Sequence, residues 1–238
     1  MNERNMMVST VDPEGKWLYR VGGIATFILV IGYFLTFPVY AGVGGPSPSG
    51  AEARLIYYGG HIAGWWAILG LMVFTDFLYV VVWLALYRAL KAINLNMLLL
   101  AIACKGLFVI LDLAVVWTNQ AALFNLSSSY AAATTDAQRA LLVAAAGAPS
   151  AVLDSPLLGI YVILIPSLGT VFAGFVMLRG IFSRGAAYLT FAVGITGVLA
   201  VVNPLFLGAS DPTHIINALL ATIWYLLVGW KLFRLGQQ

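Results

Sequence analysis

Three charged side chains lie inside long apolar stretches of the sequence and are the first candidates for chemistry: Asp76, Lys105 and Asp112. An ion in the hydrocarbon core of a bilayer costs at least about 3 kcal/mol, so a charged residue placed there is a candidate functional residue. Asp76 and Lys105 would lie at comparable depths, about 18 and 13 Å from the cytoplasmic ends of their segments, at the rise of an α-helix. We therefore expect these two side chains to form an ion pair.

This pair has two interpretations. It either neutralises both charges and fixes the packing of two helices, or it contributes to a proton or ion relay or to the polar floor of a ligand cavity. Asp112 shares a helix face with Lys105, but two turns separate the residues by about 10 Å, which is too far for direct contact. Asp112 therefore needs another partner.

A second polar group is expected at the outer end of the same helices. His61 and His214, the only histidines, each open an apolar stretch, and Asp154 begins another at the same level. In the second stretch the side chains on one helix face are His61, Trp65, Met72, Asp76, Tyr79 and Trp83. The outer polar cluster that we expect consists of His61, Trp65, Asp112, Asn119, Asp154, Asn203, His214 and Asn217.

The histidines leave three interpretations open. Two imidazoles and the Asp154 carboxylate could hold a divalent metal ion, and two imidazoles alone could ligate a haem iron. His61 and His214 lack the close spacing of known metal motifs, and Asp211-Pro212-Thr213 ahead of His214 is typical of a helix start. This favours the third interpretation, interfacial residues and helix caps.

The composition identifies the environment that must position these residues. Only 9% of the 238 residues are charged, 62% are hydrophobic and the mean hydropathy is +0.96. A soluble domain carries about 25% charged residues, so the surplus apolar surface must face lipid. The net charge of +3 comes from scattered basic residues, which argues against nucleic-acid binding. Cys104 is the only cysteine and cannot form a disulfide within the chain.

Six apolar stretches are long enough to cross a bilayer, which needs about 20 helical residues. They cover approximately residues 17–43, 61–87, 96–118, 152–178, 186–207 and 214–233. We predict an all-α protein, a single transmembrane domain of residues 1–238 built as a bundle of six helices. Within the long connection from Asn119 to Ser150, a capping-box pattern at Thr135 predicts a short amphipathic helix on the outer face that ends near Gly147 and Pro149.

The distribution of lysine and arginine predicts the orientation. With the N-terminus inside, nine basic residues are cytoplasmic, Arg54 and Arg139 are outside, and Lys105 lies within a span. This bias places both termini in the cytoplasm. Glycines within the spans, among them Gly23, Gly169 and Gly194, favour close packing between helices.

Two segments resemble a known family. The stretch KWLYRVGG at residues 16–23 opens the first span, and ALYRALKAIN at residues 85–94 closes the second. Both are similar to the DUF4386 family of uncharacterised bacterial multi-span membrane proteins, in which an R-x-x-G entry and a related exit recur. The resemblance covers about residues 16–200. It implies a compact helical bundle in a bacterial inner (plasma) membrane and supplies no activity, substrate or catalytic residue.

Three functional hypotheses follow. The first is a non-enzymatic membrane protein that binds a small apolar or amphipathic ligand, or a partner subunit, in an outward-facing intramembrane cavity bordered by the outer polar cluster. The second is a metal- or haem-containing membrane enzyme that uses His61 and His214. The third is an accessory or scaffold subunit of a larger membrane complex. The sequence contains no nucleotide-binding or hydrolase motif that would favour another class.

Overall fold

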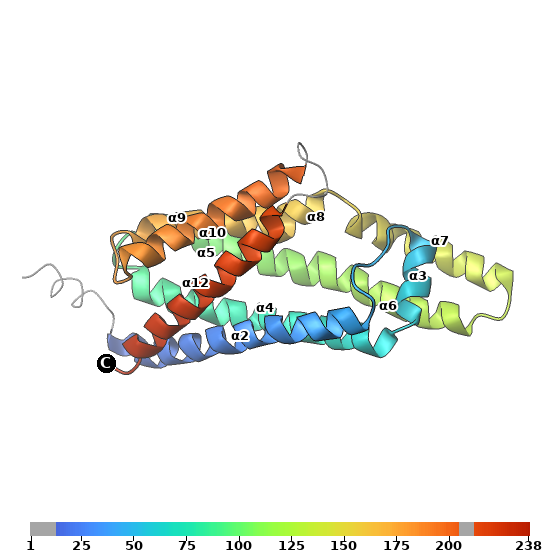
Figure 1. The fold of residues 1–238 in the computed structure, drawn as a ribbon, viewed down its shortest axis with the longest axis horizontal. Helices are drawn as coiled ribbons and strands as arrows, with labels where there is room; N and C mark the ends of the chain where they lie inside the picture. The colour runs from blue at the N-terminus through green and yellow to red at the C-terminus, as the bar shows by residue number, and fades with distance from the viewer. Residues whose placement is uncertain (1–12, 205–211) are drawn as a thin grey trace, which may run out of the picture. The chain divides into compact units, whose positions relative to one another are not determined.

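The computed structural model describes residues 13–204 and 212–238, and these residues form helices and no strands (Figure 1). Six helices among them are long and apolar enough to cross a membrane. They are α2 (Lys16–Gly42), α4 (Ile62–Leu90), the continuous helix Leu95–Ala132, the helix Leu157–Met177, α10 (Arg184–Val202) and α12 (Thr213–Leu235). The all-helical, six-span prediction is thereby confirmed, and the chain is a multi-pass integral membrane protein.

Two boundaries differ from the sequence prediction. The third span does not end at Thr118: α5 (Leu95–Leu111), η2 (Asp112–Trp117) and α6 (Thr118–Ala132) form one helix of 38 residues. The fourth begins at Leu157 with α8 (Leu157–Gly159), because Val152 and Leu153 belong to the preceding helix. The predicted end of the fifth span at Leu207, and Asp211, lie outside the described residues.

Two segments have π-helical geometry that the sequence analysis did not predict. They are η2, which starts at Asp112, and η3 (Ile160–Leu164), which precedes α9 (Ile165–Met177). The hydroxyl of Thr118 donates to the carbonyl oxygen of Leu113 at 2.9 Å, five residues earlier. Single π-helical turns inside α-helices occur frequently at functional sites.

The chain divides into two compact units. Unit 1 comprises the described parts of Met1–Ile31, Asp76–Val109 and Gly159–Gln238, and unit 2 comprises Gly32–Thr75 and Ile110–Leu158. In unit 1, α9 packs against α10 and α10 against α12. A Cβ atom on Gly23 would lie 2.6 Å from the backbone nitrogen of Phe233, so glycine allows α2 and α12 to approach closely, as predicted.

In unit 2 the short helix α3 (Ala51–Gly59) packs against α6 and against α7 (Asp136–Leu153) (Figure 1). The capping box predicted at Thr135 is present, and the Thr135 hydroxyl accepts a hydrogen bond from the backbone N–H of Gln138. However, α7 does not end near Gly147 and Pro149; it continues to Leu153 with Pro149 inside the helix. Residues 119–150 are therefore mostly helical.

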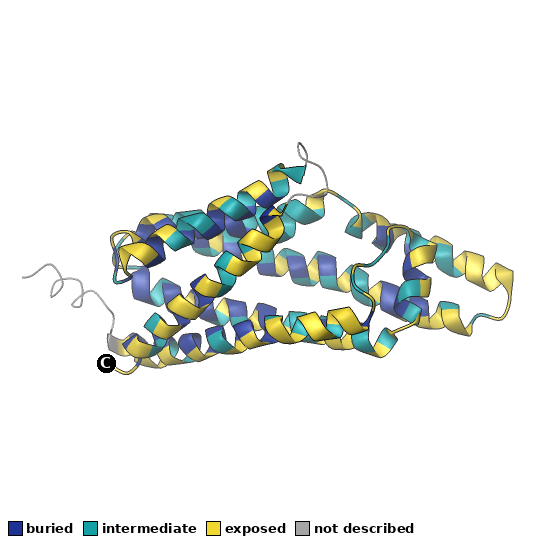
Figure 2. Cartoon of the chain, viewed as in Figure 1, coloured by how far each residue is buried: buried dark blue, intermediate teal, exposed yellow. Residues whose placement is uncertain are grey.

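The surface of the long helices is apolar. Exposed and buried positions alternate along α2 (Figure 2), and its exposed side chains include Ile24, Ile28, Ile31 and Leu35. These positions are three or four residues apart and lie on one helix face. An apolar face of this kind suits lipid, as expected for a membrane-spanning helix.

Candidate functional site

The most elaborate polar arrangement in unit 2 is centred on Arg54, and we call it the Arg54 centre. Its guanidinium group is buried, with the side chain only 6% exposed. Nη2 donates to Oδ1 of Asp154 at 2.6 Å, and Nη1 donates to Oδ2 of the same carboxylate at 3.2 Å. Nη1 also donates to the backbone carbonyl of Ser150 at 2.8 Å. Two parallel bonds to one carboxylate form the strongest geometry available to arginine.

Helix α3 positions Arg54 because its buried residues lie on one side. Arg54, Leu55 and Tyr58 are buried, and their spacing of one, three and four residues places them on a single helix face. The chain enters α3 through Gly50, whose φ of 91° is a conformation that favours glycine. The entry turn is also tied down by the Tyr57 hydroxyl, which donates to the carbonyl oxygen of Gly45.

Around the Arg54 centre, several buried polar atoms have no hydrogen-bond partner. Within unit 2 as described they are Arg54 Nε, Tyr58 OH, Trp65 Nε1 and Ser150 Oγ. Each of these groups carries a hydrogen atom that it can donate. A buried polar group without a partner costs about 1–3 kcal/mol, and native proteins contain few of them. Four such donors in one unit are therefore an unusual feature of this protein.

An aromatic cluster adjoins these donors. The Tyr58 ring lies 5.0 Å from the Trp65 ring and 4.9 Å from the Phe124 ring, both in edge-to-face geometry. The Tyr57 ring lies 5.5 Å from Trp65. Tyr58, Trp65 and Phe124 belong to one buried hydrophobic cluster with Leu55 and Leu123. Burial and, secondarily, the neighbouring Tyr58 raise the pKa of the Tyr57 hydroxyl, so Tyr57 remains a hydrogen-bond donor at neutral pH.

Asp154 differs from its partner because its side chain is 37% exposed. The sequence analysis placed it at the start of the fourth span; instead it caps the C-terminus of α7, one residue after Leu153. The Arg54 side chain is thus almost fully enclosed, whereas the Asp154 carboxylate is partly open to the surroundings.

Unit 1 contains a second buried cation, and we call its surroundings the Lys105 centre. Lys105 is 5% exposed, and its Nζ donates to the Thr170 hydroxyl at 2.6 Å. Nζ also lies 4.5 Å from the centroid of the Trp83 ring and 5.5 Å from that of Tyr79. Ring faces attract an ammonium group at such distances. Gly169 allows this approach, since a Cβ atom there would lie 3.2 Å from Lys105 Cε.

Aromatic packing extends the Lys105 centre towards α10. Trp83 stacks on Trp224 at 5.8 Å, and Trp224 Nε1 donates to the Thr190 hydroxyl at 2.7 Å. That hydroxyl in turn donates to the carbonyl oxygen of Ala186 at 2.8 Å. The chain of contacts thus connects α4, α5, α9, α10 and α12 within unit 1, with the Trp83 indole N–H buried and without a hydrogen-bond partner.

The predicted intramembrane charges are all buried: Asp76 at 5% exposure, Lys105 at 5% and Asp112 at 6%. Asp76 belongs to the same unit as Lys105, and their ion pair stays a prediction. Asp112 begins the π-helical turn η2 in unit 2.

The other predicted outer residues lie as follows. Asp154 belongs to the Arg54 centre and Trp65 to the aromatic cluster. The amide of Asn119 instead donates to the carbonyl oxygen of Val115 on its own helix at 2.6 Å. In unit 1, Asn203 donates to the Thr213 hydroxyl at 3.0 Å, and Asn217 donates to the Thr196 hydroxyl at 2.9 Å.

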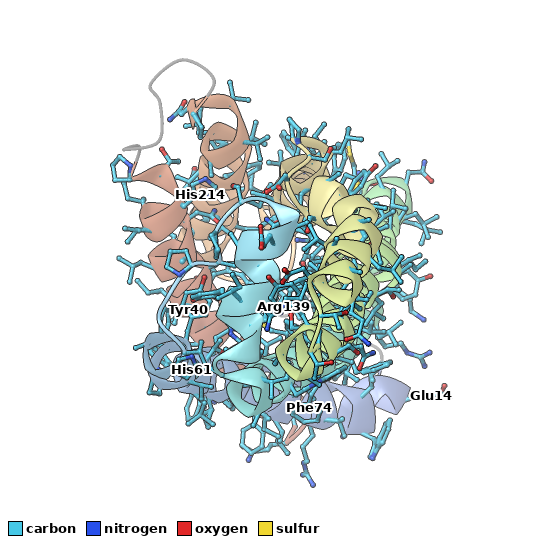
Figure 3. The ribbon with its side chains drawn as sticks, turned by 90° about the vertical axis from the view of Figure 1, so that its right-hand side faces the viewer. Glu14, Tyr40, His61, Phe74, Arg139 and His214 are labelled. Atoms are coloured by element: carbon cyan, nitrogen blue, oxygen red, sulfur yellow. The ribbon has the colours of Figure 1, made fainter. Side chains whose placement is uncertain are left out.

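His61 and His214 are both exposed (Figure 3). In the part of the chain that the structure describes, no group of three or more His, Cys, Asp or Glu side chains is arranged to hold a metal ion. The metal and haem interpretations of His61 and His214 stay predictions.

The sequence analysis missed Arg54, Tyr58 and Ser150 as site residues. Arg54 was counted only as one of two outer basic residues. A signal was present in the sequence, because Leu55 and Tyr58 are large side chains on the same helix face as Arg54. Comparison of the chain with protein-family models, curated proteins and solved structures found no match. The DUF4386 resemblance therefore stays a proposal.

Proposed function

We propose that this membrane protein is a non-enzymatic binding protein for a small amphipathic molecule, which it takes up at the Arg54 centre. The observation that carries the proposal is the juxtaposition of four buried, unpartnered donors with an aromatic cluster in unit 2. Donors suit the polar end of a ligand, and the partly exposed rings of Tyr40 and Trp66 at the edge of the cluster suit its apolar part. A core built only for stability would pair its polar groups or omit them.

The location of the site follows from charge distribution. Nine basic residues against two favour an orientation with both termini in the cytoplasm, which places α3, α7 and the Arg54 centre on the outer side. In this orientation α7 packs against α6, the outer continuation of the third span. The resemblance to the DUF4386 family supports a bacterial plasma membrane as the location.

Thermal unfolding of the purified full chain in a neutral detergent tests the proposal. The probes are compounds with an apolar chain and an acceptor-bearing end, such as decanoate, methyl decanoate and a short-tailed quinone. We expect at least one class to raise the melting temperature, since a ligand that binds only the folded state stabilises it. The stabilisation should be lost in Trp65→Leu and kept in Trp17→Leu, whose indole is exposed. No stabilisation by any probe would reject the proposal.

A further inference from the structure

The ion pair at the Arg54 centre is asymmetric in its exposure. The Arg54 side chain is 6% exposed and the Asp154 side chain 37%. The carboxylate can therefore turn away to the exposed side while the guanidinium stays where it is. Buried arginine without an anion is strongly unfavourable, so Asp154 can leave only if another negative group replaces it.

The geometry specifies which negative group fits. The two Nη atoms of Arg54 already hold a carboxylate, at 2.6 and 3.2 Å. Planar, two-oxygen anions match the arginine fork, and exchanging one carboxylate for another keeps the charge of the site constant. A neutral ester or alcohol leaves Arg54 and Asp154 paired.

A carboxylate that replaces Asp154 could accept hydrogen bonds from donors that Asp154 does not contact. Arg54 Nε and Ser150 Oγ are buried without partners, and Ser150 already contacts Arg54 through its backbone carbonyl. A carboxylate accepts about four hydrogen bonds, whereas the Asp154 carboxylate accepts two from Arg54. A carboxylate that is not tethered to α7 can reach these further donors.

The apolar part of the ligand follows from the neighbouring side chains. Tyr58 is one helical turn beyond Arg54 on α3, and its ring contacts Trp65 and Phe124. Resting on the proposed function, we infer that the ligand is a long-chain carboxylic acid whose carboxylate replaces that of Asp154 on Arg54. Its alkyl chain packs on the partly exposed rings of Tyr40 and Trp66, which contact the buried rings of Trp65 and Phe124.

A photoaffinity competition tests this inference on the full chain in bilayer discs of neutral lipid. The probe is a diazirine-bearing hexadecanoic acid at pH 8, well above the ordinary pKa of a carboxyl group. Cross-linked peptides are mapped by mass spectrometry, and excess hexadecanoic acid or its methyl ester serves as competitor. We expect saturable labelling in residues 51–69 and 118–154, with the acid competing about tenfold better than the ester, as a charge-assisted bond requires.

Two variants sharpen the competition. Asp154→Asn removes the resident carboxylate but keeps its shape, so the acid should compete about tenfold better than in the wild type. Asp136→Asn, on the same helix but exposed and 4.0 Å from Arg139, should leave the competition unchanged.

The possible results of the competition separately test the carboxylate, its exchange with Asp154 and binding itself. Equal competition by acid and ester would overturn the carboxylate inference and leave amphipathic binding standing. Acid preference that Asp154→Asn does not strengthen would overturn the exchange. Absence of saturable labelling would overturn the proposed function together with the inference.

Discussion

The two units solve the same physical problem, a buried cation, in different ways. Lys105 is held by the Thr170 hydroxyl and the faces of Trp83 and Tyr79, all of them fixed by packing within unit 1. Arg54 is held by a carboxylate that is 37% exposed, and its own Nε and three further buried donors of unit 2 have no hydrogen-bond partner. The Lys105 centre leaves one buried donor, the Trp83 indole N–H, without a hydrogen-bond partner, whereas unit 2 has four such donors and the carboxylate that holds Arg54 is partly exposed. This difference is why we assign ligand binding to Arg54.

The largest expected effect concerns the Lys105 centre and the predicted pair with Asp76. Lys105→Met preserves side-chain length but removes the charge, which would leave the buried Asp76 uncompensated. We expect a loss of about 3–5 kcal/mol in the free energy of unfolding. Asp76→Asn in the same chain should recover most of this loss. Reversible unfolding in mixed micelles measures both, and simple additivity of the two substitutions would refute the ion pair.

Arg54→Lys should have the next largest effect. Lysine keeps the positive charge but lacks the planar fork that holds both oxygens of Asp154. We expect a loss of about 1–3 kcal/mol in the free energy of unfolding, because at least one charge-assisted hydrogen bond disappears. The matched control is Arg139→Lys, which alters an exposed arginine and should change stability little. A loss no larger than in this control would mean that the fork does not matter.

Trp224→Phe tests the contribution of the Trp224–Thr190 hydrogen bond to the Lys105 centre. The substitution keeps an aromatic ring against Trp83 but removes the N–H that donates to Thr190 at 2.7 Å. One lost hydrogen bond should cost about 1 kcal/mol, and ligand-induced stabilisation at the Arg54 centre should be unaffected. Loss of ligand response in this variant would show that the two centres act together.

The smallest effect is expected at the start of α7. Thr135→Ala removes the cap that accepts from the Gln138 N–H, and caps of this kind contribute about 1 kcal/mol. Because Asp154 caps the opposite end of α7, fraying from the start of the helix should weaken ligand-induced stabilisation only slightly. Hydrogen exchange of the first turn of α7 gives the direct measurement, and unchanged protection there would contradict the role of the cap.

The spans were predictable because lipid imposes a simple rule. A helix in hydrocarbon must be apolar over about 20 residues, so the six stretches can be recognised from the hydropathy along the sequence. The same cost argument singled out Asp76, Lys105 and Asp112 in the sequence, and all three are buried in the structure. Capping chemistry is equally local, and the Thr135 box was found for that reason.

The Arg54 centre was not predictable in the same way. Its partners Ser150 and Asp154 are 96 and 100 residues away in the sequence, and no local pattern encodes such a contact. Helix α3 has nine residues, so the face that Leu55 and Tyr58 share with Arg54 gives only a short periodic signal. The continuation of α7 past Pro149 likewise depends on packing against α3 and α6, because proline alone favours a helix end.

The most direct test compares the two centres in one experiment. The measured quantity is the melting temperature in decanoate minus that in methyl decanoate, for the wild type, Arg54→Gln and the double variant Asp76→Asn, Lys105→Met. The account predicts an acid-specific stabilisation in the wild type and in the double variant, and none in Arg54→Gln. Acid-specific stabilisation that survives Arg54→Gln, or that disappears only in the double variant, would contradict it.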